Sequence, residues 1–345
     1  MKLDAILTPM KKKILLVLVV SLVALGGLYL YNAISPADLL LSDQVSTATR
    51  SEANQNNDCT SYEKYDTSTD ECYYECDTDA ECADIEKKID QELATWADDY
   101  TAFSNENNDN KNIDTKEAQK TIETKKTALG STIYKVSTGE KITLDSGIDA
   151  TQYQNIWRDF ARISPDSISD SYIDEYLVYS DSKDDSIAYV ADDDGNGKWT
   201  LAINLAMYLQ DSKKEQSFTL IHELTHIITL NSSQVVVSGG CKTYSTAEGC
   251  ANQSSYLNQF VTKFWTPDML RIVAKEKDVY TGRESKFTSE YAATNPEEDI
   301  AESFALYVLS QSPTHPKTQF FQNYPALVQI RLDIRSNLGG YARRR

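Results

Sequence analysis

The chain has 345 residues, 41% of them apolar, which is enough for one globular domain of ordinary size with appendages. Acidic residues outnumber basic ones by 52 to 34, and the formal net charge is -18. A surface this negative repels phosphate backbones, so we expect no nucleic-acid partner.

The N-terminus has the pattern of a membrane anchor. Lysines at positions 11–13 precede a run without charged residues over positions 14–31. A run of about 18 or more apolar residues can span a bilayer, and basic residues before it orient the N-terminus to the cytoplasm. We expect a cytoplasmic segment at residues 1–13, a transmembrane helix at residues 14–33 and an extracytoplasmic remainder. If the helix is instead a cleaved signal peptide, the protein is secreted.

A polar tether at residues 34–58 leads to a cysteine-rich module at residues 59–82. An even number of cysteines in an exported chain indicates disulfides, and the 6 candidates are Cys59, Cys72, Cys76, Cys82, Cys241 and Cys250. We expect the last two to close a loop, and the pairing of the first four stays open. A four-cysteine zinc site is the alternative for the module, but paired Cys-x-x-Cys units are missing.

Residues 83–130 have helical features. Apolar residues recur at helical spacing over residues 83–100, a second polar helix is predicted over residues 114–129, and residues 104–112 have the composition of a loop. This segment can be a spacer, a substrate-positioning module or an inhibitory pro-segment, and the sequence does not choose among them.

The pattern changes at about residue 131, where we expect the compact domain, residues 131–345, to begin. Short alternating stretches predict strands at residues 132–136, 141–144, 175–179, 187–190 and 199–203, with a helix at residues 152–163. The last two strands are expected to pair across a hairpin turn at residues 192–197, which lacks the register of a calcium loop. The strand at residues 199–203 resembles the edge strand along which an extended peptide could pair.

Residues 213–230 carry the strongest chemical signal. Apolar residues recur there at helical spacing, so we expect a buried or amphipathic helix. His222 and His226 then lie one turn apart on one face, where two imidazoles can bind one metal ion. Glu223 follows the first histidine and can take a proton from a water molecule on that ion. The motif predicts a zinc site with Glu223 as general base.

A chance match with no function is the competing explanation for this motif. The chain has only 3 histidines, however, and two of them fall in its most apolar predicted helix outside the anchor. Two histidines and a carboxylate are costly to bury without a partner, and a metal ion is the simplest partner. This composition favours the metal site.

A third protein ligand must come from another segment, because Thr229 and Ser232 replace the Gly and His of the metzincin pattern. The best donor is an acidic segment at residues 295–309. Asn295 suits a helix N-cap and Pro296 a first helical position, so a helix is expected to begin there.

The acidic residues of this segment have two explanations. Glu297, Glu298 and Asp299 could simply complement the positive end of the helix dipole. Glu302, however, lies one turn beyond Glu298 on the same flank, which favours a functional role. Spacing alone does not separate Glu297 from Glu298 as the ligand. Two weaker competitors are Glu248, as an alternative ligand, and His315, as an alternative oxyanion donor.

Together, these motifs resemble those of the anthrax lethal factor-like group of gluzincin metallopeptidases. The residues that carry the resemblance are His222-Glu223-x-x-His226, Tyr291 and Glu298-x-x-x-Glu302-x-Phe304. The match covers residues 219–309. The resemblance implies that Glu298 is the third zinc ligand and that Tyr291 donates its hydroxyl to the transition-state oxyanion. It implies that Glu302 is a carboxylate behind the ligands.

We therefore expect an α+β, zincin-like metallopeptidase domain with a twisted sheet, an active-site helix and C-terminal helices. It would use one Zn2+ to hydrolyse peptide bonds in extracytoplasmic proteins. The alternatives are a non-catalytic surface binding or adhesion module with a structural zinc site, and a hydrolase acting on another kind of bond. The sequence names neither the substrate nor the oligomeric state.

Overall fold

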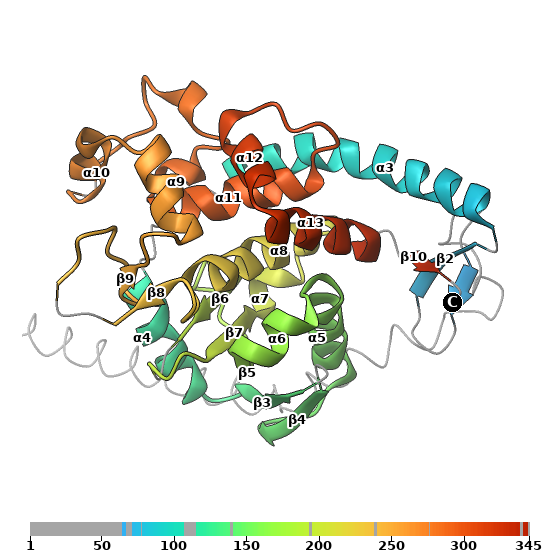
Figure 1. Ribbon diagram of the computed structural model, residues 1–345. Helices are drawn as coiled ribbons and strands as arrows, with labels where there is room; N and C mark the ends of the chain where they lie inside the picture. Colours follow the sequence, from blue (N-terminus) through green and yellow to red (C-terminus); the bar gives the residue numbers. More distant parts are fainter. Residues whose placement is uncertain are drawn as a thin grey trace, which may run out of the picture. The chain divides into compact units, whose positions relative to one another are not determined.

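The computed structural model describes residues 64–66, 71–76, 78–106, 115–138, 141–192, 195–237, 240–275, 277–338 and 341–343. The chain divides into two compact units, Met1–Cys72 and Tyr73–Arg345. In the first unit the structure describes β1 (Lys64–Asp66) and the start of β2 (Glu71–Cys76). The other elements belong to the second unit (Figure 1).

The predicted membrane anchor lies outside the described residues, as do residues 1–13 and the tether at residues 34–58. Across the ranges that the structure does describe, no helix combines the length and the apolar character needed to cross a bilayer. The anchor therefore stays a prediction.

One predicted disulfide is confirmed. Cys241 is bonded to Cys250, in a loop that follows β8 (Val235–Val236) and ends at β9 (Cys250–Ala251), and these two strands pair in antiparallel fashion. Cys59 and the side chains of the cysteines at positions 72, 76 and 82 lie outside what the structure describes, so their pairing stays open.

The second unit is a mixed α+β structure whose main sheet has five strands. Its strands are β3 (Thr132–Ser137), β4 (Lys141–Ser146), β5 (Ile173–Tyr179), β6 (Ala188–Ala191) and β7 (Trp199–Asn204). They lie in the order β4-β3-β5-β7-β6, with β5 parallel to β7 and the other neighbours antiparallel. The expected strands are thus present, and β6 and β7 pair as predicted.

The prediction that residues 199–203 form an edge strand is wrong. β7 pairs with β5 on one side and with β6 on the other, and all of its residues are buried. A strand that is buried along its whole length is typical of a position covered on both faces, which is where β7 lies. Among the described strands, β6 occupies this edge of the sheet.

Helices cover both faces of the sheet. Successive side chains of β5 and β7 point to opposite faces, so each face has its own core. Tyr176, Val178 and Leu201 pack into the main core together with α8 (Lys213–Leu230). The intervening residues, represented by Leu177, pack on the opposite face in a small cluster that includes Ile122 of α4 (Thr115–Lys126). The α8 face also carries α5 (Thr151–Ile163) and α6 (Asp166–Tyr172).

Helix α8 has the bounds that its sequence predicts. It begins with a capping box, in which the backbone N–H of Glu215 donates to Ser212 Oγ and the backbone N–H of Ser212 donates to Glu215 Oε2. It ends at Asn231, whose side-chain amide donates to the Ile227 carbonyl at 2.8 Å. Nearly all of its residues from Gln216 onward are buried, so the polar ones among them must find partners inside the protein.

Helix α11 (Pro296–Leu309) crosses over α8 on the side away from the sheet (Figure 1). Asn295 caps it as expected, since its Oδ1 accepts the Glu298 backbone N–H at 2.8 Å. Ile300 and Phe304 lie in the main core. The site-bearing segments of the sequence are therefore two stacked helices.

The remaining helices are α3 (Asp79–Glu106), α7 (Leu205–Tyr208), α9 (Tyr256–Phe264), α10 (Pro267–Val273), α12 (Pro316–Phe320) and α13 (Pro325–Leu338). Of these, α3, α9, α12 and α13 contact α11, and α7 contacts β7. Short 3-10 helices are η2 (Glu284–Lys286), η3 (Tyr291–Ala293) and η4 (Phe321–Asn323), and β10 (Tyr341–Arg343) pairs in parallel with β2. The predicted helix at residues 83–100 is longer than expected, because α3 continues through the first part of the predicted loop.

A buried ion pair anchors α11 to α12. Asp299 is 0% exposed and Lys317 2%, and their charged groups are in direct contact. Trp265 donates its indole N–H to Asp299 Oδ2 at 2.7 Å, and the ammonium lies 4.0 Å from the centre of the Phe287 ring. A buried charge pair is costly to break because one partner is left uncompensated.

We expect Lys317→Met to lower the free energy of unfolding by about 3–5 kcal/mol, because it leaves Asp299 buried without its cation. Denaturant unfolding of the full chain measures this. Arg271→Met is the matched control, since Arg271 is 73% exposed in its pair with Asp268, and exposed pairs contribute up to about 1 kcal/mol. Equal losses for the two variants would show that the buried pair does not stabilise the fold.

Candidate metal centre

Helix α8 presents two imidazoles from one face. His222 and His226 are one turn apart, and their ring centres are 4.8 Å apart. The two Nε2 atoms are separated by 3.0 Å. His222 is 8% exposed, so this contact is made inside the protein.

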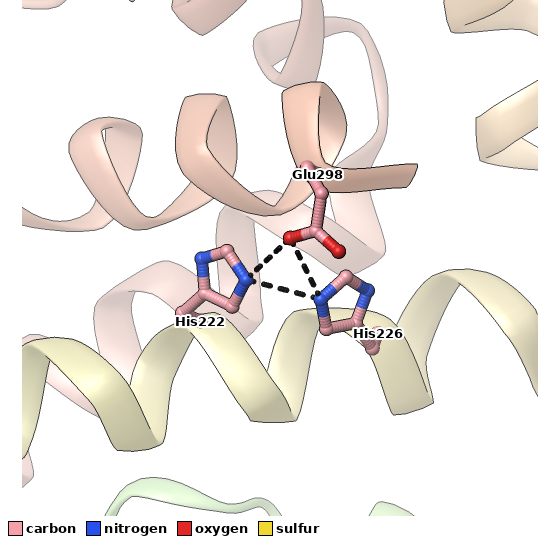
Figure 2. Close-up of side chains that lie close together, drawn as sticks. All are labelled: His222, His226 and Glu298. Carbon is pink, nitrogen blue, oxygen red and sulfur yellow. Dashed lines mark hydrogen bonds and ion pairs between the residues drawn. The ribbon is translucent and has the colours of Figure 1, made fainter. Parts of the chain in front are cut away.

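Helix α11 brings a carboxylate to the same point. Glu298 Oε2 lies 2.9 Å from His222 Nε2 and 3.4 Å from His226 Nε2, which closes the triangle in Figure 2. The three potential ligand atoms lie within 4.8 Å of one another. Among the described residues, this group can hold a metal ion.

The proton arrangement of His222 fits a cation at this point. Its Nδ1 lies 2.8 Å from Glu302 Oε1, and a carboxylate oxygen accepts, so Nδ1 carries the proton. Its Nε2 faces Glu298 and His226. Without a metal ion, burial opposes the charge on His222, but Glu298 and Glu302 outweigh it and raise the pKa of His222 well above its usual value, so Nε2 then also carries a proton. A metal ion at this point would take the place of that proton.

Glu302 is held by more than His222. Tyr100 OH donates to its Oε1 at 2.6 Å, Ser289 Oγ donates to its Oε2 at 2.7 Å, and Ser104 Oγ also donates to Oε2. Burial opposes the charge on Glu302, but His222 and these hydroxyls outweigh it and hold the pKa below its usual range. Glu302 is thus an anion that fixes the tautomer of His222.

Glu297 and Glu298, which spacing could not separate, have different surroundings. Glu297 is absent from the metal-holding group, and its Oε2 accepts the Tyr244 hydroxyl at 2.9 Å. Burial raises the pKa of Glu297 to about 7. Burial also opposes the charge on Glu298, but His226 and His222 outweigh it and hold its pKa well below the usual range. The geometry selects Glu298.

Glu223 and Tyr291 lie in the same pocket as the three candidate ligands. Burial raises the pKa of Glu223, with the two histidines opposing that effect. Burial, together with the nearby carboxylates of Glu298 and Glu223, raises the pKa of Tyr291 well above its ordinary value. A buried carboxyl group and a buried phenol therefore accompany the metal-holding group in the pocket.

The competitors take other positions. Glu248 is not a member of the metal-holding group found among the described residues. His315 caps α12, where its Nδ1 accepts the Lys317 backbone N–H at 3.3 Å, and it is not among the residues that line the pocket.

Three residues that donate to Glu302 are not predicted from the sequence: Tyr100 and Ser104 of α3, and Ser289. Helical spacing contained a signal for the first two, because they continue the buried stripe of Ile89 and Leu93 along α3. Ser289 lies in an irregular segment just before η3, where periodicity carries no information.

No protein-family model, curated protein or solved structure matches this chain. The metal centre is therefore assigned from its own geometry.

We expect Glu298→Gln to bind a divalent metal at least about 100-fold more weakly than wild type, since losing a ligand costs more than losing an outer partner. Glu297→Gln should retain wild-type affinity, because its carboxylate bonds Tyr244 instead. Competition of the full chain with a chelator for Zn2+ or Co2+ measures both. The opposite ranking would move the ligand assignment to Glu297.

Proposed function

We propose that this protein is a zinc-dependent endopeptidase. The observation that carries the proposal is one pocket that contains two histidines and a glutamate able to hold a metal ion, a carboxylate next to the first histidine, and a tyrosine. In order, these residues are His222, His226, Glu298, Glu223 and Tyr291.

Zinc suits this set of donors. It binds histidine nitrogen and carboxylate oxygen in tetrahedral sites at about 2.0–2.2 Å, which puts neighbouring ligand atoms roughly 3.3 Å apart. The distances of 2.9, 3.0 and 3.4 Å among these donors are close to that value. Three protein ligands leave one position open, as in catalytic rather than structural zinc sites. Zinc bound there would polarise a carbonyl and lower the pKa of a water molecule to about 7.

Glu223 serves as the general base. It is buried beside the two histidines, and desolvation raises the pKa of its carboxyl group. A base is most effective when its pKa is near the working pH, so this shift favours proton transfer. Glu223 takes a proton from the attacking water and passes it to the leaving amine.

Tyr291 stabilises the oxyanion that forms from the substrate carbonyl. Its ring lies 5.8 Å from that of His222, and its raised pKa keeps the hydroxyl protonated, so it can donate a hydrogen bond. Such donors act where charge develops in the transition state. The resemblance to the anthrax lethal factor-like gluzincins implies the same roles for Tyr291 and Glu298 and a zincin-like fold.

The substrate is an extended peptide that pairs with β6. Residues 186–190, which include part of that strand, line the pocket together with Glu223. β6 is an edge strand among those described, so no described strand pairs with its outer side. Backbone pairing would hold a peptide beside the metal centre irrespective of most side chains. In this proposal β6 is the edge strand along which the peptide pairs, a role that the sequence suggested for residues 199–203.

The sequence also supports a location outside the cell membrane. The apolar run within residues 14–33 would anchor the chain, and the basic residues before it would leave the catalytic unit on the extracytoplasmic side. Its substrates are then proteins at or near the cell surface.

The first test compares cleavage of a diverse peptide library by the full chain, by the chain with a chelator, and by Glu223→Gln. We expect cleavage by wild type alone, with the variant retaining zinc, because Glu223 is a base and not a ligand. Full activity of the variant would exclude the proposed base. A wild type that holds zinc but cleaves nothing would favour the alternative of a surface binding module with a structural zinc site.

Tyr291→Phe should lower kcat by roughly 100-fold or more while zinc affinity stays unchanged, as expected for loss of one oxyanion donor. Steady-state kinetics on a peptide found in the library measures it. Tyr280→Phe is a matched control, because Tyr280 is not among the residues that line the pocket. An unchanged kcat in the Tyr291 variant contradicts the role.

A further inference from the structure

Glu302 is surrounded by donors that come from three segments. Among the described residues, four groups donate to its two oxygens: His222 Nδ1 and Tyr100 OH to Oε1, and Ser289 Oγ and Ser104 Oγ to Oε2. A carboxylate offers about four lone-pair positions, so this one is saturated. It cannot rotate without breaking at least two of these bonds.

Two of the four donors come from α3, far away in the sequence. Tyr100 is 3% exposed and Ser104 5%, and they lie one turn apart on the face of α3 that meets α11. Without α3, both oxygens of Glu302 lose one donor. The remaining bonds to His222 and Ser289 would leave the carboxylate free to tilt, and His222 would tilt with it.

Helix α3 is fixed against the site by contacts along its length. Tyr100 packs edge-on against Phe218 of α8 with ring centres 5.2 Å apart, and Trp96 and Phe103 pack against the same ring. At the end of the helix, Asn105 Oδ1 accepts the Glu290 backbone N–H at 3.0 Å, directly before Tyr291.

Charged groups in the middle and in the C-terminal part of α3 add to this anchoring. Asp99 pairs with Lys214 of α8 at 2.5 Å, and Asp90 pairs with Arg335 of α13 at 2.6 Å. The helix therefore holds its two hydroxyls at a fixed place relative to α8 and α11.

We infer that Tyr100 and Ser104 are positioning residues of the metal centre, which act through Glu302 to aim His222 Nε2 at the metal. Helix α3 is then a working part of the catalytic unit, and not a spacer or an inhibitory pro-segment. The inference rests on the metal site of the proposed function, but not on its peptidase activity.

The test measures the affinity of the full chain for Zn2+ by chelator competition. We expect the double variant Tyr100→Phe/Ser104→Ala to bind Zn2+ about 10- to 100-fold more weakly, the usual cost of losing outer partners of a ligand. Substituted Co2+ should show shifted d–d bands, because the orientation of His222 changes. Thr101→Ala is the matched control, since the Thr101 hydroxyl donates only within its own helix, to the Ala97 carbonyl at 3.1 Å.

A second comparison separates positioning from packing. If Tyr100 acts through Glu302, Tyr100→Phe should weaken zinc binding less in a Glu302→Gln background than in wild type, because coupled residues are not additive. Wild-type zinc affinity in the double variant, with only the thermal stability of the metal-free chain lowered, would reduce α3 to a packing element and overturn the inference. A wild-type chain that binds no zinc overturns the metal centre itself, which is a different result.

Discussion

The hydrogen bond between His222 Nδ1 and Glu302 Oε1 is the contact on which the site depends. It joins α8 to α11 inside the protein, at 2.8 Å, between groups that are 8% and 3% exposed. Because it fixes which nitrogen of His222 carries the proton, it also decides which nitrogen is available to a metal. The packing of α11 on α8 thus also determines which nitrogen of His222 can bind a metal ion.

This arrangement concentrates negative charge in a largely buried pocket. Glu223, Glu298 and Glu302 are all buried within one pocket, in a chain whose net charge is already -18. Burial alone would favour protonation of such carboxylates, but His222 and hydroxyl donors outweigh it at Glu302, and the two histidines outweigh it at Glu298. A divalent cation held by Glu298 and the histidines would add further positive charge at this place, so metal binding and the stability of this core are expected to be linked.

The sequence predicted the features that depend on local patterns, and it did not predict those that depend on how distant segments pack. Helices α8 and α11 were predicted with their bounds because caps and apolar spacing are local, as at Ser212 and Asn295. The choice between Glu297 and Glu298 depends on where α11 lies over α8, which no local pattern contains. The edge position of β6 likewise depends on strand order, and the buried run of β7 was mistaken for an edge.

The role of α3 could not be predicted for the same reason, because it depends on a contact with a distant segment. Its stripe of apolar residues predicted a helix but not a partner, and the stripe changes from aliphatic residues to Tyr100 and Ser104 as it reaches Glu302. Hydroxyls at the end of an apolar stripe are costly unless they meet an acceptor. Two buried hydroxyls at the end of an apolar stripe therefore indicate a buried acceptor, which a count of apolar residues does not reveal. In α3 that acceptor is the carboxylate of Glu302, which the helix helps to position.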